Sequence, residues 1–350
     1  MMNPAPVPGN GGTLQRRRNQ VLLTAVLAIS LCACNSTSPL AAHGQLPASM
    51  QAVVVIGGKP LLQTVDRPAP GAGEVLVKVR AAGVNPADWK RAQRASTTPV
   101  VPGWDIAGVI SAVGPGVSGW KAGDPVMGFF EGTGGYAQYA AIAVDSIASK
   151  PRKLGFDAAA GVPLAAVTAW KALVDAAGLQ RGQRVLIHGA AGGVGSAAVQ
   201  IAAVRGAYVI ATASERNHAF LRSIGANETI DYNAVRFEEH VSNADVVLNT
   251  IDEQTAIRSL PVLKPGGIMV TVAGAVPAEA CAAAQMRCVA ASRRTGTPIG
   301  QILAEVARLA DQGRFTVHVD ATFPLARASD AWDMSRTGHT RGKIILTIPP

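Results

Sequence analysis

Apolar and polar positions follow two different patterns along this chain. Residues 74–80 (Glu-Val-Leu-Val-Lys-Val-Arg) alternate with the period of a strand that has one face in water. Glycine and proline recur between residues 102 and 128, which predicts the tight turns of a small β-barrel. Near the C-terminus, an amphipathic pattern predicts a helix over 302–310, and apolar runs predict strands over 315–319 and 343–348.

The middle of the chain alternates short apolar runs with helix-compatible stretches. Residues 158–177 are alanine-rich, and 196–205 also suit a helix. The apolar runs that predict strands are 184–188, 207–212, 245–249 and 268–272. Strands that alternate with helices form a parallel sheet covered on both faces. The predicted fold class is therefore α/β, with a β-barrel domain followed by a doubly wound parallel-sheet domain.

The first 49 residues have a character of their own. They contain Arg16, Arg17 and Arg18 but no acid, and the arginines precede an uncharged run over 21–33. That run is short for a bilayer span and fits the apolar region of a secretory signal. The last residues of the run and Cys34 read Leu-Cys-Ala-Cys (31–34), which resembles the lipobox of bacterial lipoproteins. The resemblance implies lipidation of Cys34.

We therefore predict a membrane-anchored lipoprotein or a periplasmic protein, with a possible lipid anchor at Cys34. Two alternatives stay open. Translation from Met50, which opens a strand-like run, would give a cytoplasmic protein, and the apolar run could instead be a true membrane helix.

Composition narrows the classes of function. The chain has 350 residues, 48% hydrophobic and 16% charged, which allows a large core and excludes wholesale disorder. The formal net charge is +9, but no basic stripe with interleaved aromatic residues appears, so no nucleic-acid partner is expected. Four cysteines cannot build a disulfide scaffold for a chain of this size, and the sequence leaves open whether Cys281 and Cys288 pair.

A glycine-rich turn carries the strongest chemical signal. Residues 189–195 (Gly-Ala-Ala-Gly-Gly-Val-Gly) lie between a predicted strand and a predicted helix. A pyrophosphate needs backbone N–H donors, the positive end of a helix dipole and no obstructing side chain. Gly192 and Gly195 take the second and third glycine positions of the dinucleotide fingerprint, and Ala190 replaces the first. The predicted cofactor-binding residues of this turn are Ala190, Ala191, Gly192, Gly193, Val194 and Gly195.

The second strand of this unit bears on the choice between NAD and NADP. An acid about 20 residues past the glycines would bind the ribose 2′-hydroxyl. That place falls near Ala213, and Ser214 and Arg216 follow it. A hydroxyl and a guanidinium suit a 2′-phosphate, which predicts NADP(H). The alternative is that Arg216 is only a solvated residue at a helix start.

Several segments together resemble the medium-chain dehydrogenase/reductase family. They are 84–88, 102–109, 123–126, 168–173, the glycine turn and 341–346, and the resemblance covers nearly everything from Met50 to Ile348. The chain is similar to the zinc-independent quinone oxidoreductase branch, the zeta-crystallin-like group. The resemblance implies a GroES-like catalytic domain over 50–165 completed by 302–350 and a Rossmann NADP-binding domain over 166–301. The segment 1–49 that precedes them is the predicted signal peptide and linker.

The same resemblance implies the activity and further site residues. The expected reaction is NADPH-dependent reduction of quinones, or of activated C=C bonds in enones and enals, with a small carbonyl-conjugated acceptor. Asn85 and Thr168 are implied as catalytic residues, and a homodimer or homotetramer is implied. The remaining cofactor-binding residues implied are Tyr232, Ala273, Arg341 and Lys343. Asn85 could instead cap a turn, Thr168 could pack within a helix, and Tyr232 could be a surface residue.

Zinc is not expected. Zinc-dependent relatives carry Cys where this chain has Asn85 and His where it has Trp104. A catalytic zinc needs three protein ligands, and the six histidines are scattered. No general acid stands out, so water is the expected proton source. Two other functions stay open: a zinc-free NADP-dependent alcohol or aldehyde dehydrogenase, and a non-catalytic NADPH-binding lipoprotein.

Overall fold

The structure is a computed structural model that describes residues 46–94, 98–131, 133–292 and 295–349. Cys34 and the predicted signal run over 21–33 lie outside the described residues, so lipidation stays a prediction. Pro47–Pro350 forms one compact unit. In the described part of the chain, no helix combines the length and apolar character needed to cross a membrane.

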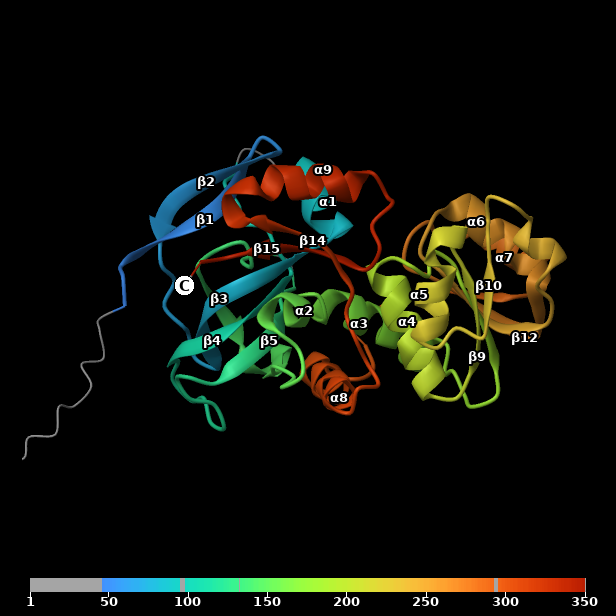
Figure 1. Cartoon of the computed structure of the whole chain (residues 1–350), viewed down its shortest axis with the longest axis horizontal. Helices are drawn as coiled ribbons and strands as arrows, with labels where there is room; N and C mark the ends of the chain where they lie inside the picture. Colours follow the sequence, from blue (N-terminus) through green and yellow to red (C-terminus); the bar gives the residue numbers. More distant parts are fainter. Residues whose placement is uncertain (1–45, 95–97, 132, 293–294, 350) are drawn as a thin grey trace, which may run out of the picture. The chain divides into compact units, whose positions relative to one another are not determined.

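The N-terminal part of this unit is built on strands (Figure 1). A hairpin of β1 (Ser49–Ile56) and β2 (Lys59–Asp66) precedes a seven-stranded sheet of order β14-β15-β3-β4-β5-β7, with β6 paired to β3. Its strands are β3 (Glu74–Val84), β4 (Asp105–Val113), β5 (Pro125–Phe129), β6 (Tyr139–Ala143), β7 (Ile147–Ser149), β14 (Val319–Pro324) and β15 (Lys343–Thr347). The predicted strand over 74–80 is confirmed. Leu76, on the face that the pattern placed in water, is buried as well.

The second sheet has six strands, and every neighbouring pair is parallel. Its order is β10-β9-β8-β11-β12-β13. The strands are β8 (Arg184–Ile187), β9 (Tyr208–Thr212), β10 (Glu228–Ile230), β11 (Ala244–Asn249), β12 (Leu263–Thr271) and β13 (Arg287–Ala290). Counted from β8, this is the 3-2-1-4-5-6 order of the dinucleotide-binding fold. The predicted doubly wound parallel sheet is therefore confirmed.

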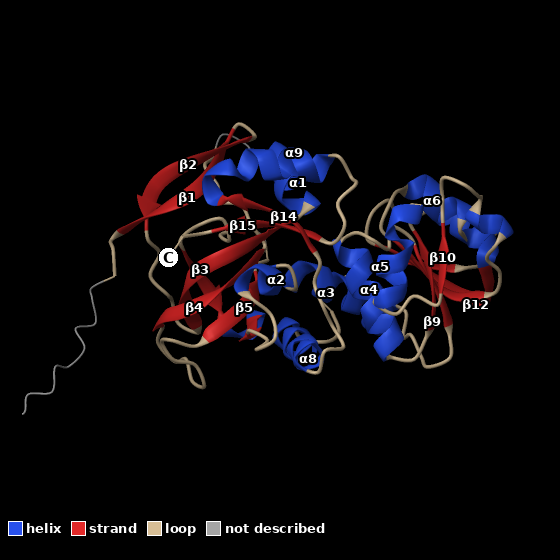
Figure 2. Cartoon of the chain, viewed as in Figure 1, coloured by secondary structure: helices blue, strands red, loops and turns tan. Residues whose placement is uncertain are grey.

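Helices cover both faces of the parallel sheet (Figure 2). Successive residues of a strand point to opposite faces. Val185 and Ile187 pack in one cluster with residues of α4 (Gly193–Val204) and α5 (His218–Ser223). Leu186, between them, packs in another cluster with residues of α6 (Glu253–Arg258) and α7 (Ala278–Ala283). Both faces of these strands are buried, which explains why the strands appear in the sequence as continuous apolar runs.

One helical prediction is confirmed, and the other stretch is divided into several elements. The helix predicted over 302–310 is confirmed as α8 (Ile299–Asp311). The stretch 158–177 is not one helix but α2 (Phe156–Ala160), α3 (Pro163–Trp170) and a π-helical turn over Lys171–Ala176. Pro163 lacks an N–H and cannot continue the hydrogen bonds of α2, yet it suits the first turn of α3.

The strand predicted over 315–319 is wrong, because β14 begins only at Val319. The side-chain amide of Gln200 takes the place of a strand partner. Its Oε1 accepts from the Thr316 N–H at 2.7 Å, and its Nε2 donates to the Thr316 carbonyl at 3.0 Å. The remaining helices are α1 (Pro86–Arg94) and α9 (Ala328–Arg336), and short 3-10 turns lie at Val144–Ser146, Glu215–Asn217, Phe237–Glu239, Leu260–Val262 and Leu325–Arg327.

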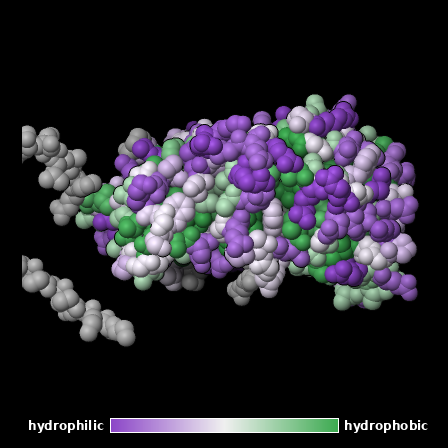
Figure 3. Space-filling model, turned by 90° about the horizontal axis from the view of Figure 1, so that it is seen from below, coloured by the Kyte–Doolittle hydropathy of each residue, from purple (hydrophilic) through white to green (hydrophobic). Residues whose placement is uncertain are grey.

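One hydrophobic cluster spans both sheets. A single cluster contains Met127 and Phe129 of β5, residues of α3, α4 and α8, and Val185 of β8. On the outside, charged side chains pair locally, as in Arg308–Glu305 and Arg327–Asp330. Figure 3 shows hydrophilic and hydrophobic side chains interspersed on one face of the molecule.

Cys281 and Cys288 form a disulfide, which answers the question that the sequence left open. It joins α7 to β13 at the edge of the parallel sheet, with the two Cα atoms 6.1 Å apart.

Candidate active site

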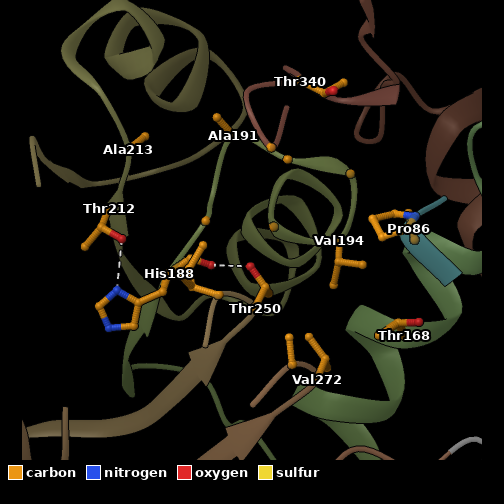
Figure 4. A pocket seen from close by; sticks show the side chains of 18 of the residues that line it. Pro86, Thr168, His188, Ala191, Val194, Thr212, Ala213, Thr250, Val272 and Thr340 are labelled. Atoms are coloured by element: carbon orange, nitrogen blue, oxygen red, sulfur yellow. Dashed lines mark hydrogen bonds between the residues drawn. The ribbon is translucent and has the colours of Figure 1, made fainter. Parts of the chain in front are cut away.

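A cavity of about 1040 Å³ lies where the carboxyl ends of the parallel strands meet residues of the other sheet. Ligands of such sheets bind at this end, beside the point where the strand order reverses. Figure 4 shows side chains around it from the glycine turn (Ala191 and Val194), from α3 (Thr168) and from the C-terminal segment (Thr340). The predicted site residues that line it are Asn85, Thr168, Ala191, Gly192, Gly193, Val194, Gly195, Ser214, Arg216, Tyr232, Ala273 and Lys343.

Two predicted residues stand apart from the cavity lining. Ala190 is fully buried, and its N–H donates to the Thr212 carbonyl at 3.2 Å. Arg341 lies just outside. Its Nε donates to Asn217 Oδ1 at 2.7 Å, and its Nη2 donates to the Arg216 carbonyl at 2.9 Å. Ala190 is thus part of the packed interior of the turn. Arg341 holds Arg216 and Asn217, which follow β9, through its hydrogen bonds.

The glycine turn fits a dinucleotide phosphate group. Gly192 is the N-cap of α4, and the first N–H groups of a helix have no partner within it. A methyl group on Gly195 would lie 2.2 Å from the Gly189 carbonyl oxygen, so only glycine permits this close turn. At Gly192 the nearest atom to such a methyl is 3.4 Å away, so this backbone is open to a ligand. The residues present therefore suit a bound pyrophosphate.

Sequence reasoning missed the role of Gly189. Its φ of +64° lies in the left-handed region, and an added Cβ would lie 2.4 Å from Thr250 Oγ1. The tight turn after β8 is thus made at Gly189. From the sequence alone, the first glycine position of the fingerprint was assigned to the next residue, Ala190. The run of glycines was the signal that could have found it.

Ser214 and Arg216 both line the cavity. Ser214 follows β9, and its Oγ accepts from Asn217 Nδ2 at 3.1 Å. Arg216 Nη2 donates to the His339 carbonyl at 3.3 Å. Within the described part of the chain, most of the other guanidinium donors are left for another acceptor. No carboxylate stands at Ala213, the place where an NAD-binding acid would be expected.

Another part of the cavity meets a buried polar cluster. Asn85, at the junction of β3 and α1, has an amide whose Nδ2 donates to Asp105 Oδ2 at 2.9 Å and to the Gly83 carbonyl at 3.4 Å. Lys343, the first residue of β15, donates from Nζ to Asn85 Oδ1 and, at 3.2 Å, to Asp105 Oδ2. Both Asn85 N–H donors are therefore engaged by the protein, which suits a positioning role better than donation to a substrate.

Two buried carboxyl groups accept hydrogen bonds in this arrangement, and no sequence pattern indicated either of them. Asp105 Oδ1 accepts from the Leu164 N–H at 2.7 Å. Asp88 Oδ2 accepts from the Asn85 N–H at 2.7 Å and from the Tyr136 hydroxyl at 2.9 Å. Burial raises the pKa of Asp105, against the opposing effect of Lys343. Burial also raises the pKa of Asp88 to about 7.

His188 is a further cavity residue that sequence reasoning did not single out. Its Nδ1 lies 2.9 Å from Thr212 Oγ1 and its Nε2 lies 2.9 Å from Ser259 Oγ, as Figure 4 shows for the first. Burial lowers the pKa of His188 to about 4, so the ring is neutral at pH 7. Its position directly after β8, at the carboxyl end of a parallel strand, was the available signal.

Comparison with known proteins agrees with this architecture. The alcohol dehydrogenase GroES-like domain family matches residues 71–152, and the zinc-binding dehydrogenase family matches residues 224–346. The chain is 31% identical over 304 residues to the chloroplast envelope quinone oxidoreductase homolog of Arabidopsis thaliana, covering 81% of this chain and 92% of that protein. It is 35% identical over 290 residues to the chloroplastic NADPH-dependent alkenal/one oxidoreductase of the same plant, covering 78% and 72%.

A solved structure is similar as well. The quinone oxidoreductase from Coxiella burnetii has a TM-score of 0.77 and 29% identity, and the match covers 86% of this chain and 100% of that one. The chain therefore belongs to the medium-chain dehydrogenase/reductase family. It is an oxidoreductase, with quinone oxidoreductases among its relatives.

The name of one matching family raises the question of zinc. Among the described residues, no group of three or more His, Cys, Asp or Glu side chains could hold a metal ion. Asn85 and Trp104 are both buried, and the Asn85 amide is engaged by Lys343 and Asp105. That the enzyme works without zinc stays a prediction.

Proposed function

We propose that this oxidoreductase reduces quinones, or the activated C=C bond of enones and enals, with NADPH. One observation carries the proposal. A single cavity joins the glycine turn, which suits a dinucleotide, to Asn85, Thr168 and Lys343. Relatives named as quinone oxidoreductase and alkenal/one oxidoreductase support the same substrate class.

The cofactor would supply the hydride, and the protein would bind and position the cofactor and the acceptor. A reduced nicotinamide, when bound, supplies a hydride to the electron-poor carbon of the acceptor. The glycine turn and the start of α4 would hold the pyrophosphate, and Ser214 and Arg216 would hold the 2′-phosphate. Apolar side chains such as Leu164 and Val272 line the cavity, and they would help to exclude water from the reacting atoms once cofactor and acceptor are bound.

The test is a screen of the full chain for NADPH oxidation with quinones, enones and enals. Turnover with at least one of these classes is the expected result. Reduction of NADP⁺ by alcohols, without activity in the screen, would instead favour an alcohol dehydrogenase. Tight NADPH binding without any turnover would favour a non-catalytic NADPH-binding protein. A homodimer or homotetramer belongs to the same proposal, and analytical ultracentrifugation would test it.

The preference for NADPH gives a sharper prediction through Arg216. A charge-assisted hydrogen bond to a phosphate contributes roughly 1.5–3 kcal/mol. Arg216→Ala should therefore weaken NADPH binding by about 10- to 100-fold, while NADH binding changes little. Ala213→Asp should act in the opposite sense, because a carboxylate repels the phosphate and accepts from a free 2′-hydroxyl. Dissociation constants for both cofactors, measured by fluorescence titration, provide the check.

A matched control is available on the next helix. Arg222 on α5 donates to Thr229 Oγ1 at 2.7 Å and is absent from the residues that line the cavity. Arg222→Ala should leave both dissociation constants unchanged. Equal losses for NADH and NADPH in Arg216→Ala would show that Arg216 has a structural role, and the proposed preference for NADPH would be wrong.

We further propose export and lipid anchoring through Cys34. The arginines at 16–18, the apolar run over 21–33 and the lipobox-like end support this. The Cys281–Cys288 disulfide supports it independently, because disulfides persist mainly in oxidising compartments. Cys34→Ala should abolish labelling with a fatty-acid precursor and release the protein from the membrane fraction. A cytosolic product with Met50 as its N-terminus would contradict the proposal.

A further inference from the structure

Lys343 has surroundings that are unusual for a lysine. The residue is 4% exposed, although lysine is almost never buried unless it is paired. Its Nζ contacts Asn85 Oδ1 and Asp105 Oδ2. Asp105 is fully buried, and the Leu164 N–H fixes its other oxygen. The ammonium group is thus held at a defined point by Asn85, which follows β3, and by Asp105 of β4.

Glycines make room for the lysine stem. A methyl group on Gly193, the first residue of α4, would lie 2.9 Å from the Lys343 Cδ atom. A methyl group on Gly161 would lie 3.2 Å from its Cγ atom. Lys343 therefore extends past the start of the dinucleotide turn, and its charged end reaches Asn85 and Asp105.

The ammonium has hydrogen-bonding capacity left over. A lysine side chain has three N–H donors. Among the described residues, Lys343 Nζ has two acceptors, Asn85 Oδ1 and Asp105 Oδ2. Lys343, Asn85 and Thr168 all line the cavity, whereas Asp105 does not. The third donor is thus available to a molecule in the cavity.

We propose that Lys343 is a catalytic residue, whose ammonium donates a hydrogen bond and then a proton to the carbonyl oxygen of a conjugated acceptor. The inference rests on the proposed reduction of enones. When hydride from the reduced nicotinamide forms a C–H bond at the β-carbon, the C=C electron pair moves towards the oxygen. The Lys343 N–H bond breaks as the O–H bond forms, which gives an enol and a neutral amine.

The remaining steps complete the proton balance. The enol becomes the saturated ketone when water protonates its α-carbon and the O–H proton returns to solvent. The amine takes a proton from solvent after the product leaves. Asp105 and Asn85 act as positioning residues in this scheme, because they touch Lys343 rather than the substrate. Donors of this kind typically account for a factor of about 10²–10³ in kcat.

The first experiment compares wild type with Lys343→Met, a variant of similar length without charge, using but-3-en-2-one as acceptor. We expect kcat to fall by about 100- to 1000-fold, while the dissociation constant for NADPH changes little. Added methylammonium should restore part of the lost kcat. If NADPH binding weakens and kcat is retained at saturation, Lys343 serves the cofactor phosphates and the proposal is wrong.

Two further variants separate chemistry from folding. Lys343→Met leaves the buried Asp105 carboxylate without its cation, so the double variant Asp105→Asn/Lys343→Met removes both charges together. A folded double variant with wild-type kcat would overturn the proposal. Lys171→Met is the matched control, since Lys171 is also buried and paired with a carboxylate, Asp175 at 3.0 Å, but is absent from the cavity lining. It should lose stability and keep kcat.

A binding measurement tests hydrogen-bond donation by Lys343 even if the proposed function is wrong. 4-Nitrophenol changes its absorption spectrum when it ionises, and its phenolate resembles an enolate oxygen. Bound to wild type, it should ionise at a lower pH than in water, and Lys343→Met should abolish this shift. An equal shift in both proteins would refute the role of Lys343. Absence of NADPH oxidation by wild type with every acceptor would refute the proposed function instead.

Discussion

Replacing Gly195 by alanine is expected to destabilise the protein and to abolish cofactor binding. The added methyl would lie 2.2 Å from the Gly189 carbonyl oxygen and 2.6 Å from the Ala190 Cα atom. Both are backbone atoms of the turn after β8, so neither can rotate away. An overpacked site costs about 1–3 kcal/mol or more, and relief here requires the turn itself to move. Urea denaturation and NADPH titration of the variant would measure the two effects.

Two other glycines provide controls with separate outcomes. A methyl on Gly192 meets no atom closer than 3.4 Å, and its φ of −74° suits any residue. Gly192→Ala should therefore fold like wild type and bind NADPH more weakly, because the methyl obstructs the approach of the pyrophosphate. Gly155→Ala, with no atom within 4 Å of the added methyl, should change neither property. Wild-type stability and affinity in Gly195→Ala would show that the turn is not the cofactor site.

The parallel sheet could be predicted from the sequence because both of its faces are buried. The strands over 184–188, 207–212, 245–249 and 268–272 read as continuous apolar runs, and β8, β9, β11 and β12 lie there. The short strands β10 and β13 were not predicted. The first has three residues, and the second lies at the sheet edge with two exposed positions. Neither offers enough apolar residues to stand out from a loop.

The polar cluster beneath the cavity could not be predicted in the same way. Asn85 and Lys343 are 258 positions apart, and Tyr136 is 48 positions from Asp88. No local period connects such residues, since only the pairing of β15 with β3 brings Lys343 beside Asn85. The family resemblance implied cofactor contact for Lys343, but its partners follow from the tertiary structure alone. Asp88 and Asp105 have no sequence pattern that distinguishes them from surface acids.

Asp88 leads to the second large effect, a dependence of stability on pH. Its Oδ1 atom is buried and has no hydrogen-bond partner among the described residues. Burial is the main cause that raises its pKa from 3.8 to about 7, with Asp105 adding to the rise, while hydrogen bonds from Asn85 and Tyr136 and the charge of Lys343 oppose it. The folded state therefore holds this proton more tightly than the unfolded chain does.

The sign of the effect follows from that difference. Below about pH 4 both states keep the proton, and Asp88 costs no stability. Between about pH 4 and pH 7 only the unfolded state ionises, so the free energy of unfolding falls by up to about 1.4 kcal/mol per pH unit. Above about pH 7 both states are ionised, and the full loss, on the order of 4 kcal/mol, has been reached.

Asp88→Asn removes this titration and should gain stability relative to wild type as the pH rises. Between pH 5 and pH 8 the difference in unfolding free energy should move in favour of the variant by roughly 2–3 kcal/mol. Urea denaturation at several pH values measures it. Tyr136→Phe removes a hydrogen bond to the carboxylate, and should move the transition to higher pH. Asp311→Asn should show a flat difference over this range, because the pKa of Asp311 is lowered and it titrates at lower pH. A flat difference for Asp88→Asn would mean that Asp88 is already ionised at pH 5, so that the buried cluster carries a net negative charge.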